Sequence, residues 1–391
     1  MEIRAAVVNA AGSDFNLETV ELQEPHADEV VVEIAGVGIC RTDIGVKDGH
    51  LPFAFPAVLG HEGSGTVVSA GRDVKSISVG DKVVISFDSC ATCRHCRMGE
   101  PASCHEFMLY NFSGTRIDGT SSLTRLGEPL ASNFFGQSSM ATHSVARERN
   151  VVRLPAGAPV EIAGPLGCGI QTGAGAVFTS FDVQPGSSVA VLGGGSVGLA
   201  AVMAAVVREA SPIIVVEPHQ SRRELALELG ATHVVDPGAG SIGEQIRRIA
   251  TMGVDYGFDT AAVLPATEEL LMAMGVRGAV GLIGMPANPA EALPLNILHA
   301  QVLGLTVRGI VEGDADPQTF IPYLLDLYRQ GKFPFDRLIT TMPISRINDA
   351  VAAQRRCEAI KIVLTTAVSD HVGPTPTIHP GETRPPLAHR I

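Results

Sequence analysis

A glycine-rich turn between an apolar strand and an apolar helix constrains the fold of this chain more than any other stretch. Residues 188–192 (SVAVL) form the expected strand, and residues 199–207 (LAAVMAAVV) form the expected helix. Between them lie Gly193, Gly195 and Gly198 in a G-x-G-x-x-G pattern that includes Val197. Such glycines allow a tight turn and let a pyrophosphate approach the backbone at the N-terminus of the helix. The pattern is weak by itself in a chain with 42 glycines.

An acidic residue at the end of the next strand strengthens the dinucleotide interpretation. The strand 213–217 (IIVVE) ends at Glu217, nineteen residues after Gly198. A carboxylate at that distance can bind both hydroxyls of an adenosine ribose, and it would repel a 2′-phosphate. The expected cofactor is therefore NAD rather than NADP, although Arg222 and Arg223 nearby weaken this preference.

Alternating strands and helices follow this unit and predict its fold class. The expected strands are 233–235, 254–258, 279–283 and 305–310, and the expected helices between them are 221–229, 242–249 and 265–274. Repeated βα units form a doubly wound parallel sheet, so the class is α/β. After residue 312 the rhythm breaks, and helices 318–329 and 347–358 lead to a strand at 361–364. This last part is expected to pack back on the N-terminal part of the chain.

Length and charge narrow the class further. A chain of 391 residues suggests about two domains, and residues 1–90 alternate short apolar runs with turns, as a β-rich barrel does. The formal net charge of −12 argues against a nucleic-acid partner. No apolar stretch reaches the roughly 20 residues of a membrane span, and no leader-like segment starts the chain, so a cytoplasmic location is expected. Residues 368–391 have few apolar side chains and are expected to be a disordered tail.

Four cysteines crowd into one short stretch and predict a metal site. Cys90, Cys93, Cys96 and Cys104 have the spacing C-x2-C-x2-C-x7-C. Four thiolates on one loop can surround zinc and leave no position open, so this site is expected to be structural. An iron–sulfur cluster is the competing interpretation, but the usual continuation to Cys-Pro is absent.

Three further residues of ligand type lie far apart in the sequence. Cys40, His61 and Cys168 could bind a second zinc ion through three protein ligands and leave the fourth position for a substrate. An isolated histidine in a glycine-rich turn and two scattered cysteines are more often ordinary polar and core residues. This set is therefore weak until the rest of the chain supports it.

Together these motifs resemble the zinc-dependent medium-chain alcohol dehydrogenases over residues 1–366. The resemblance is carried by GICRTD at 38–43, GHEGSG at 60–65, the four-cysteine loop, GCGIQTG at 167–173 and VLGGGSVGL at 191–199. Residues 111–116, 133–136 and 309–314 are similar to the aryl-alcohol (benzyl-alcohol) branch. The resemblance implies a discontinuous GroES-like catalytic domain (1–169 and 312–367) and a Rossmann-type NAD-binding domain (170–311). It also implies two zinc ions per chain and a homo-oligomer, either dimer or tetramer.

The resemblance also assigns roles to particular residues. Cys40, His61 and Cys168 become ligands of the catalytic zinc, Glu62 a transient ligand, and Asp43 the residue that orients His61. Thr42 can pass the alcohol's proton to the cofactor ribose. The implied cofactor contacts are Thr172 at the nicotinamide, Val197 near the pyrophosphate, and Arg41 and Lys361 at the phosphates.

The sequence departs from the family pattern in its proton relay. Many relatives have a histidine three residues after the relay hydroxyl, whereas this chain has Gly45. The proton is therefore expected to pass from Thr42 through the ribose to water, without help from His50.

The substrate pocket can be predicted only from residue types. Aromatic and aliphatic side chains near the ligand segments, which suit a flat apolar alcohol, are Phe53, Phe87, Leu109, Phe134 and Phe135. The favoured function is the reversible oxidation of a primary aryl or allylic alcohol. A thiol-dependent formaldehyde dehydrogenase shares the zinc motifs and is the first alternative, and a non-catalytic nucleotide-binding protein is the second.

Overall fold

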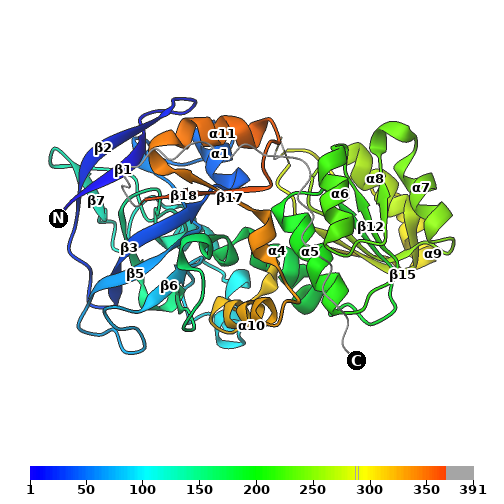
Figure 1. The fold of residues 1–391 in the computed structure, drawn as a ribbon, viewed down its shortest axis with the longest axis horizontal. Helices are drawn as coiled ribbons and strands as arrows, with labels where there is room; N and C mark the ends of the chain where they lie inside the picture. Colours follow the sequence, from blue (N-terminus) through cyan, green and yellow to red (C-terminus); the bar gives the residue numbers. More distant parts are fainter. Residues whose placement is uncertain (287, 289, 367–391) are drawn as a thin grey trace, which may run out of the picture.

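The computed structural model describes residues 1–286, 288 and 290–366, so the predicted disordered tail (368–391) lies outside the described residues. Figure 1 shows two lobes side by side, with α4 and α10 between them. One lobe contains the N-terminal strands together with α1, α11, β17 and β18, and the other contains α5 to α9 around a parallel sheet. No helix in the described part of the chain has the length and apolar character to cross a bilayer.

A parallel sheet of six strands forms the second lobe. Its order is β13-β12-β11-β14-β15-β16, and each pair of neighbours is parallel. Its strands are β11 (Val189–Leu192), β12 (Ile213–Val216), β13 (His233–Val235), β14 (Val254–Asp259), β15 (Met274–Leu282) and β16 (Thr306–Gly309). The order reverses between β11 and β14, where open α/β sheets bind their ligands at the carboxyl ends of the strands. The predicted doubly wound parallel sheet is therefore confirmed.

Helices cover this sheet as the sequence pattern indicates. They are α5 (Ser196–Val207), α6 (Gln220–Glu228), α7 (Ile242–Ile249), α8 (Leu264–Ala273) and α9 (Ile297–Leu303). Eight residues of α5 are buried because this alanine-rich helix packs between the sheet and α4. Helix α7 begins at Ser241, whose hydroxyl accepts a hydrogen bond from Glu244 N. The sequence pattern did not predict α9, and it placed Met274 in a helix, whereas β15 begins there.

An antiparallel sheet and a mixed, mainly antiparallel sheet form the first lobe. One has the order β4-β1-β2-β7-β8, with β1 (Glu2–Val8), β2 (Phe15–Leu22), β4 (Ala57–Val58), β7 (Leu123–Arg125) and β8 (Glu128–Pro129). The other contains β3 (Glu29–Gly38), β5 (Gly63–Ala70), β6 (Lys82–Ile85), β9 (His143–Arg147), β10 (Val151–Arg153), β17 (Ile339–Pro343) and β18 (Lys361–Thr365). Helices of this lobe are α1 (Arg41–Lys47), α2 (Arg94–Arg97), α3 (Phe107–Phe112) and α11 (Ile347–Arg355).

The C-terminal segment returns to the first lobe. Strand β18 pairs antiparallel with residues 36–38 of β3 and parallel with β17. Helices α4 (Gly169–Gly175) and α10 (Pro317–Arg329) lie where the two lobes meet (Figure 1). The domain bounds at residues 169, 311 and 367 stay a prediction. This return places Lys361 beside the segments that carry the zinc-ligand candidates.

Candidate active site

The turn from β3 into α1 brings Cys40 and Asp43 together. Cys40 has an extended backbone at the N-cap of α1, and its N–H donates to Asp43 Oδ2 at 2.9 Å. The Thr42 hydroxyl oxygen lies 3.7 Å from Cys40 Sγ. The pattern of residues 1–90 suggested only strands and turns, so α1 is a correction. Its physical reason is the local hydrogen bond from Cys40 to Asp43, which satisfies a donor at the helix start.

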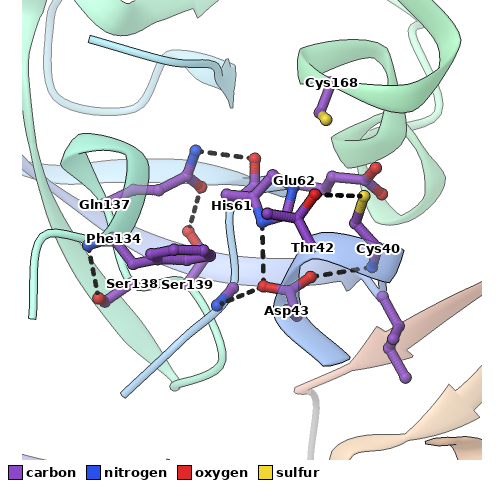
Figure 2. Close-up of polar contacts among 12 residues, drawn as sticks. Cys40, Thr42, Asp43, His61, Glu62, Phe134, Gln137, Ser138, Ser139 and Cys168 are labelled. Carbon is purple, nitrogen blue, oxygen red and sulfur yellow. Dashed lines mark hydrogen bonds and ion pairs between the residues drawn. The ribbon is translucent and has the colours of Figure 1, made fainter. Parts of the chain in front are cut away.

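His61 is fixed in orientation and has one free ring nitrogen. Its Nδ1 lies 3.0 Å from Asp43 Oδ1, which also accepts a hydrogen bond from Gly60 N at 3.0 Å. Its Nε2 is buried and has no partner among the described residues. Figure 2 shows the Asp43 carboxylate joining His61 to the backbone at Cys40. Burial opposes the charged imidazole, but Asp43 and Cys40 outweigh it and raise the pKa of His61.

Glycine is required at residue 60 for this turn. Gly60 has φ of +97°, and a Cβ there would lie 2.5 Å from Met140 N. A larger residue would push the turn away from the segment 137–140. Gln137 in this segment holds the turn from the other side, because its Nε2 donates to His61 O at 2.9 Å (Figure 2). The position of His61 therefore depends on backbone contacts as well as on Asp43.

Cys168 approaches the same point from the start of α4. One donor atom from each of Cys40, His61, Glu62 and Cys168 lies within 4.8 Å of the others. Figure 2 shows the Cys168 sulfur pointing toward the side where Glu62 and Cys40 lie. Hydrogen bonding with Cys168 holds the pKa of the Cys40 thiol well below its usual value, whereas the same contact and burial raise the pKa of Cys168.

These residues fit a catalytic zinc ion. Two sulfurs and a buried imidazole nitrogen without a hydrogen-bond partner converge from three segments, which is the donor set zinc prefers. The Asp43 contact fixes the other nitrogen of the ring, as carboxylates do beside ligand histidines. A cation here would also allow both thiols to ionise. The structure thus brings together the three ligand candidates that the sequence separates widely.

Glu62 is held by a buried lysine. Lys361 Nζ lies 2.8 and 3.0 Å from the two Glu62 oxygens, and it also donates to Ile39 O at 3.1 Å. Burial opposes the charged ammonium, but Glu62 outweighs it and raises the pKa of Lys361. Lys361 was predicted at a cofactor phosphate. Such a contact would require the lysine to loosen its ion pair with Glu62.

The four-cysteine loop forms a second metal-ligand cluster. The sulfurs of Cys90, Cys93, Cys96 and Cys104 lie within 4.8 Å of one another, and none forms a disulfide. Backbone N–H groups of Cys90 and Cys93 donate to the Cys104 and Cys90 sulfurs at 3.3 and 3.2 Å. Burial opposes ionisation, yet hydrogen bonds from Thr92 and Cys93 lower the pKa of Cys90 to about 6. This closed set of four donors fits a structural zinc ion.

The glycine turn follows β11 at the switch point of the parallel sheet. Gly193 has φ of +98°, and a Cβ at Gly198 would lie 1.9 Å from Gly193 O, so both positions require glycine. A Cβ at Gly195 would meet nothing within 4 Å, which leaves that side of the turn open. Glu217 Oε2 accepts a hydrogen bond from Gly194 N at 2.7 Å. The turn and the acidic residue predicted to bind a dinucleotide are therefore in contact.

Among the other predicted cofactor residues, Thr172 and Arg222 lie near this turn, whereas Arg41 lies on α1. A Cβ at Gly173 would lie 1.9 Å from Val197 O, so the absence of a side chain lets α4 cross close to α5 and places Thr172 beside the turn. Arg222 donates to Ala359 O at 3.1 Å, and its Nε is buried with no partner among the described residues. Arg41 is exposed at the start of α1. Their contacts with a cofactor stay predictions.

The predicted pocket residues differ in burial, because Phe87 and Phe134 are buried whereas Leu109 is exposed. Phe134 is fully buried, and its ring meets those of Phe53 and His61 edge-on, with centroids 5.2 and 5.3 Å apart. Phe87 is also buried and lies 5.7 Å from the Phe107 ring. Leu109 is 49% exposed on α3, so it could line only an open part of a pocket. The aromatic residues form one cluster against His61, and Leu109 lies at its edge.

Comparison with known proteins agrees with this geometry. The family model "Alcohol dehydrogenase GroES-like domain" matches residues 26–156, and the model "Zinc-binding dehydrogenase" matches residues 196–329. The chain is 46% identical to geraniol dehydrogenase of Castellaniella defragrans over 363 residues, which cover 92% of this chain and 97% of the relative. The chain belongs to the zinc-dependent medium-chain alcohol dehydrogenases. Their GroES-like domain and Rossmann-type parallel sheet are thus confirmed here.

Solved structures place this alcohol dehydrogenase close to the aryl-alcohol branch. The structure of benzyl alcohol dehydrogenase from Acinetobacter calcoaceticus is 39% identical, with a TM-score of 0.91 and coverage of 94% of this chain and all of that chain. An alcohol dehydrogenase zinc-binding domain protein from Burkholderia ambifaria is 43% identical, with a TM-score of 0.92 and coverage of 94% and 99%. The predicted resemblance to the aryl-alcohol branch is therefore confirmed.

Sequence reasoning missed two features of this alcohol dehydrogenase. Phe135, counted only as a pocket candidate, stacks on His61 with ring centroids 4.4 Å apart and an angle of 22°. Glu312 was not selected, although it is buried and its Oε1 lies 3.5 Å from Cys168 Sγ. Burial raises the pKa of Glu312 to about 7. Residues 309–314 were noted only as a branch motif, and this motif was the one signal for Glu312.

Proposed function

We propose that this alcohol dehydrogenase oxidises a primary aryl or allylic alcohol to its aldehyde, reversibly, with NAD as hydride acceptor. The observation that carries this proposal is the convergence of Cys40, His61 and Cys168 beside the Thr42 hydroxyl. The names of two relatives support the substrate class, because geraniol is an allylic alcohol and benzyl alcohol an aryl one. Two zinc ions per chain belong to the proposal, one in each cysteine-containing cluster.

The chain's own residues would position the reacting groups. Bound by Cys40, His61 and Cys168, zinc would polarise the alcohol oxygen and lower the pKa of its hydroxyl, and NAD would accept the hydride. Thr42, whose hydroxyl lies 3.7 Å from Cys40 Sγ, would accept the hydroxyl proton and pass it to the cofactor ribose. Asp43 keeps His61 in one orientation, so the ligand does not reorganise during the reaction.

The contacts around Glu217 support NAD over NADP. The Glu217 carboxylate accepts hydrogen bonds from Gly194 N and His219 N at 2.7 and 2.9 Å, so it is fixed at the end of β12. Each oxygen keeps a lone pair for a ribose hydroxyl. Arg223 is occupied, because it donates to Glu217 O at 2.7 Å and pairs with Asp236 at 3.0 Å. It is therefore not free to neutralise a 2′-phosphate.

The aromatic cluster supports a flat apolar substrate. The rings of Phe53, Phe112, Phe134 and Phe135 meet at angles of 60° to 89° and at centroid distances of 5.0 to 5.5 Å. This cluster ends on the His61 ring. An aryl or allylic group bound near His61 would contact ring faces and edges rather than charged groups. A thiol adduct with carboxylates would instead require cationic side chains.

A substrate panel tests the proposal. We expect benzyl alcohol, cinnamyl alcohol and geraniol to have at least about tenfold higher kcat/KM than ethanol, because burying each extra apolar group stabilises the transition state. NAD should exceed NADP by a similar factor. Formaldehyde with and without glutathione is the control for a thiol-dependent activity. Preference for the glutathione adduct, or no turnover of any of the three alcohols, would overturn the proposal.

We expect His50→Ala to leave turnover near neutral pH within about twofold of the parent. His50 is exposed and follows the end of α1, and its backbone N–H donates to Gly45 O at 2.8 Å. With glycine at residue 45, the ribose is proposed to release the proton directly to water, so general catalysis by His50 is not needed. Steady-state kinetics with benzyl alcohol from pH 6 to 9 measure this. A loss on the order of 100-fold, within the range of general acid–base catalysis, would show that His50 is the last proton carrier.

We also propose that the enzyme is a homo-oligomer. Strand β16 is at the edge of the parallel sheet, and α9 nearby exposes Ile297, Leu298 and Val302 by about 70% each. A second copy would cover these side chains. Light scattering during size-exclusion chromatography measures the molar mass and so the oligomeric state. A monomer at micromolar concentration would contradict the proposal. A cytoplasmic location stays a prediction.

A further inference from the structure

Glu312 is a buried carboxylate at the active site for which the proposed function gives no role. It is 6% exposed and begins the turn Glu312–Asp314 that follows β16. Its φ of +50° is in the left-handed region, which residues with a side chain occupy at a cost of roughly 1 kcal/mol. Such conformations persist where the surrounding structure determines them, and they are frequent at functional sites.

Close backbone packing places this turn on α4. A Cβ at Gly175 would lie 2.5 Å from Gly313 O, and a Cβ at Gly313 would lie 2.6 Å from Gln171 O. Two glycines therefore let the turn touch the helix directly. Because the backbone is held there, the Glu312 side chain must project along α4 toward its N-terminus. That end of the helix carries Cys168.

The Glu312 carboxylate contacts three residues of this segment, two of which have proposed roles. Oε1 lies 3.5 Å from Cys168 Sγ, whereas Oε2 lies 3.2 Å from Gln171 Nε2 and 3.5 Å from Thr172 Oγ1. Gln171 continues the network to Ser86 Oγ at 2.9 Å and to Gly167 O at 2.7 Å. One carboxylate thus spans a proposed zinc ligand and the proposed nicotinamide contact.

The other acidic side chains of the site have separate functions. Asp43 orients His61, and Glu62 pairs with Lys361. Within the described residues, no lysine, arginine or histidine lies in ion-pair distance of Glu312, whose closest polar contacts are the groups on α4. A carboxylate without a cation is costly to bury unless it accepts hydrogen bonds, and the donors that remain when Cys168 is ionised are Gln171 Nε2 and Thr172 Oγ1. The contacts of Glu312 therefore indicate that it acts on the position of residues at the start of α4.

We propose that Glu312 is a positioning residue that holds Cys168 and Thr172 in a fixed relation, so that the zinc ligand and the cofactor contact keep one geometry. This inference rests on the proposed function, because it assigns Thr172 to the nicotinamide. Glu312 itself need not touch the substrate. Its effect would arise because a displacement of about 1 Å in a reacting group can cost on the order of 100-fold in rate.

Two substitutions separate positioning from charge. Glu312→Gln keeps the side-chain length, and its carbonyl can face Gln171 and Thr172 while its NH2 faces the Cys168 sulfur. Glu312→Asp keeps the charge but is one methylene shorter, so its oxygens cannot reach these partners. We expect Glu312→Gln to remain within about threefold of the parent in kcat. Glu312→Asp should lose about tenfold or more, because misplaced groups react more slowly.

Two measurements without turnover accompany the kinetics. The dissociation constant of NADH is measured from the change in its own fluorescence on binding. Selective replacement of the zinc at the Cys40, His61 and Cys168 cluster by cobalt gives near-ultraviolet thiolate-to-cobalt absorption and visible d–d bands, which report on the geometry of this site. We expect Glu312→Asp to weaken NADH binding by about tenfold and to shift this absorption, because Cys168 and Thr172 are no longer held in position. Glu312→Gln should change the dissociation constant of NADH by less than about threefold and should leave the absorption close to that of the parent.

Asp314→Asn is the matched control in the same turn. Asp314 accepts a hydrogen bond from Ser180 Oγ at 2.7 Å and pairs with Arg308 at 2.8 Å, away from Cys168 and Thr172. We expect this variant to leave kcat, NADH binding and the cobalt absorption unchanged. Full activity of Glu312→Asp with loss in Glu312→Gln, or equal values for all variants, would overturn the positioning role. If instead the parent fails to bind NADH or to oxidise alcohols, the proposed function fails.

Discussion

Replacing His61 by alanine is expected to reduce kcat/KM for benzyl alcohol by about a thousandfold or more, and to lower bound zinc from two ions per chain to one. The imidazole is the one nitrogen donor of the set, and its Nε2 is buried without another partner. Without it, two cysteines and the Lys361-paired Glu62 remain. The loss in rate follows because a metal supplies several kcal/mol of charge stabilisation and each 1.4 kcal/mol is about tenfold.

Metal analysis and kinetics on the same samples measure this effect. His233→Ala is a matched control, since this histidine is exposed on β13, in the sheet that carries the glycine turn. We expect the control to keep both zinc ions and the full rate. His61→Ala should also keep its melting temperature within a few degrees, because the four-cysteine site is separate. A variant that retained two zinc ions per chain would show that His61 is not a ligand.

The identities of the ligands could be predicted from the sequence, but their meeting point could not. Cysteine and histidine are residue types that bind zinc, but only the motifs around residues 40, 61 and 168, together with the rest of the chain, indicate one site. Their convergence depends on pairing of β3 with β5 and β18 and on the crossing of α4 over α5 at Gly173. Those contacts join segments far apart in the chain, so no local periodicity reports them.

The doubly wound sheet was predictable because its strands are continuous apolar runs. All four residues of β11 and of β12 are buried, and each strand is followed by a helical pattern. Helix α1 was not predictable in this way. It has seven residues, and four of them are buried although they include Asp43 and Lys47. A helix start that depends on a Cys40–Asp43 hydrogen bond has no strong signal in residue type.

The contacts of Glu312 with Cys168 and of Phe135 with His61 could not be predicted for a different reason, although Phe135 is a pocket candidate. Glu312 and Phe135 both have positive φ, at +50° and +53°, which sequence patterns do not indicate for glutamate or phenylalanine. Their side chains meet Cys168 and His61 only because these backbones turn in this unusual way. The residues that contact a proposed zinc ligand can therefore be identified only from the structure, whereas candidates for the ligands themselves can be identified from the sequence.

Replacing Thr42 by valine is expected to lower kcat by about 100-fold to 1000-fold, the range of a lost general acid–base step. Valine has nearly the same shape, so α1 and the Cys40–Asp43 contact should be unchanged, and two zinc ions should remain bound. The hydroxyl lies 3.7 Å from Cys40 Sγ, and the proposed function assigns it the alcohol's proton. With Gly45 instead of a histidine, the only ionisable side chain of α1 between Thr42 and Lys47 is Asp43, which already contacts His61 and Cys40 N.

Thr42→Ser is the conservative control, because it keeps the hydroxyl and loses only a methyl group. We expect serine to restore kcat to within about fivefold of the parent, with NADH binding unchanged in both variants. Stopped-flow measurement of the first turnover, in H2O and in D2O, separates proton transfer from product release. If valine retained the parent rate for that first turnover, the proton would leave the alcohol without Thr42. The loss in valine together with recovery in serine would therefore establish that the hydroxyl, and not the side-chain volume at residue 42, carries the proton out of the site.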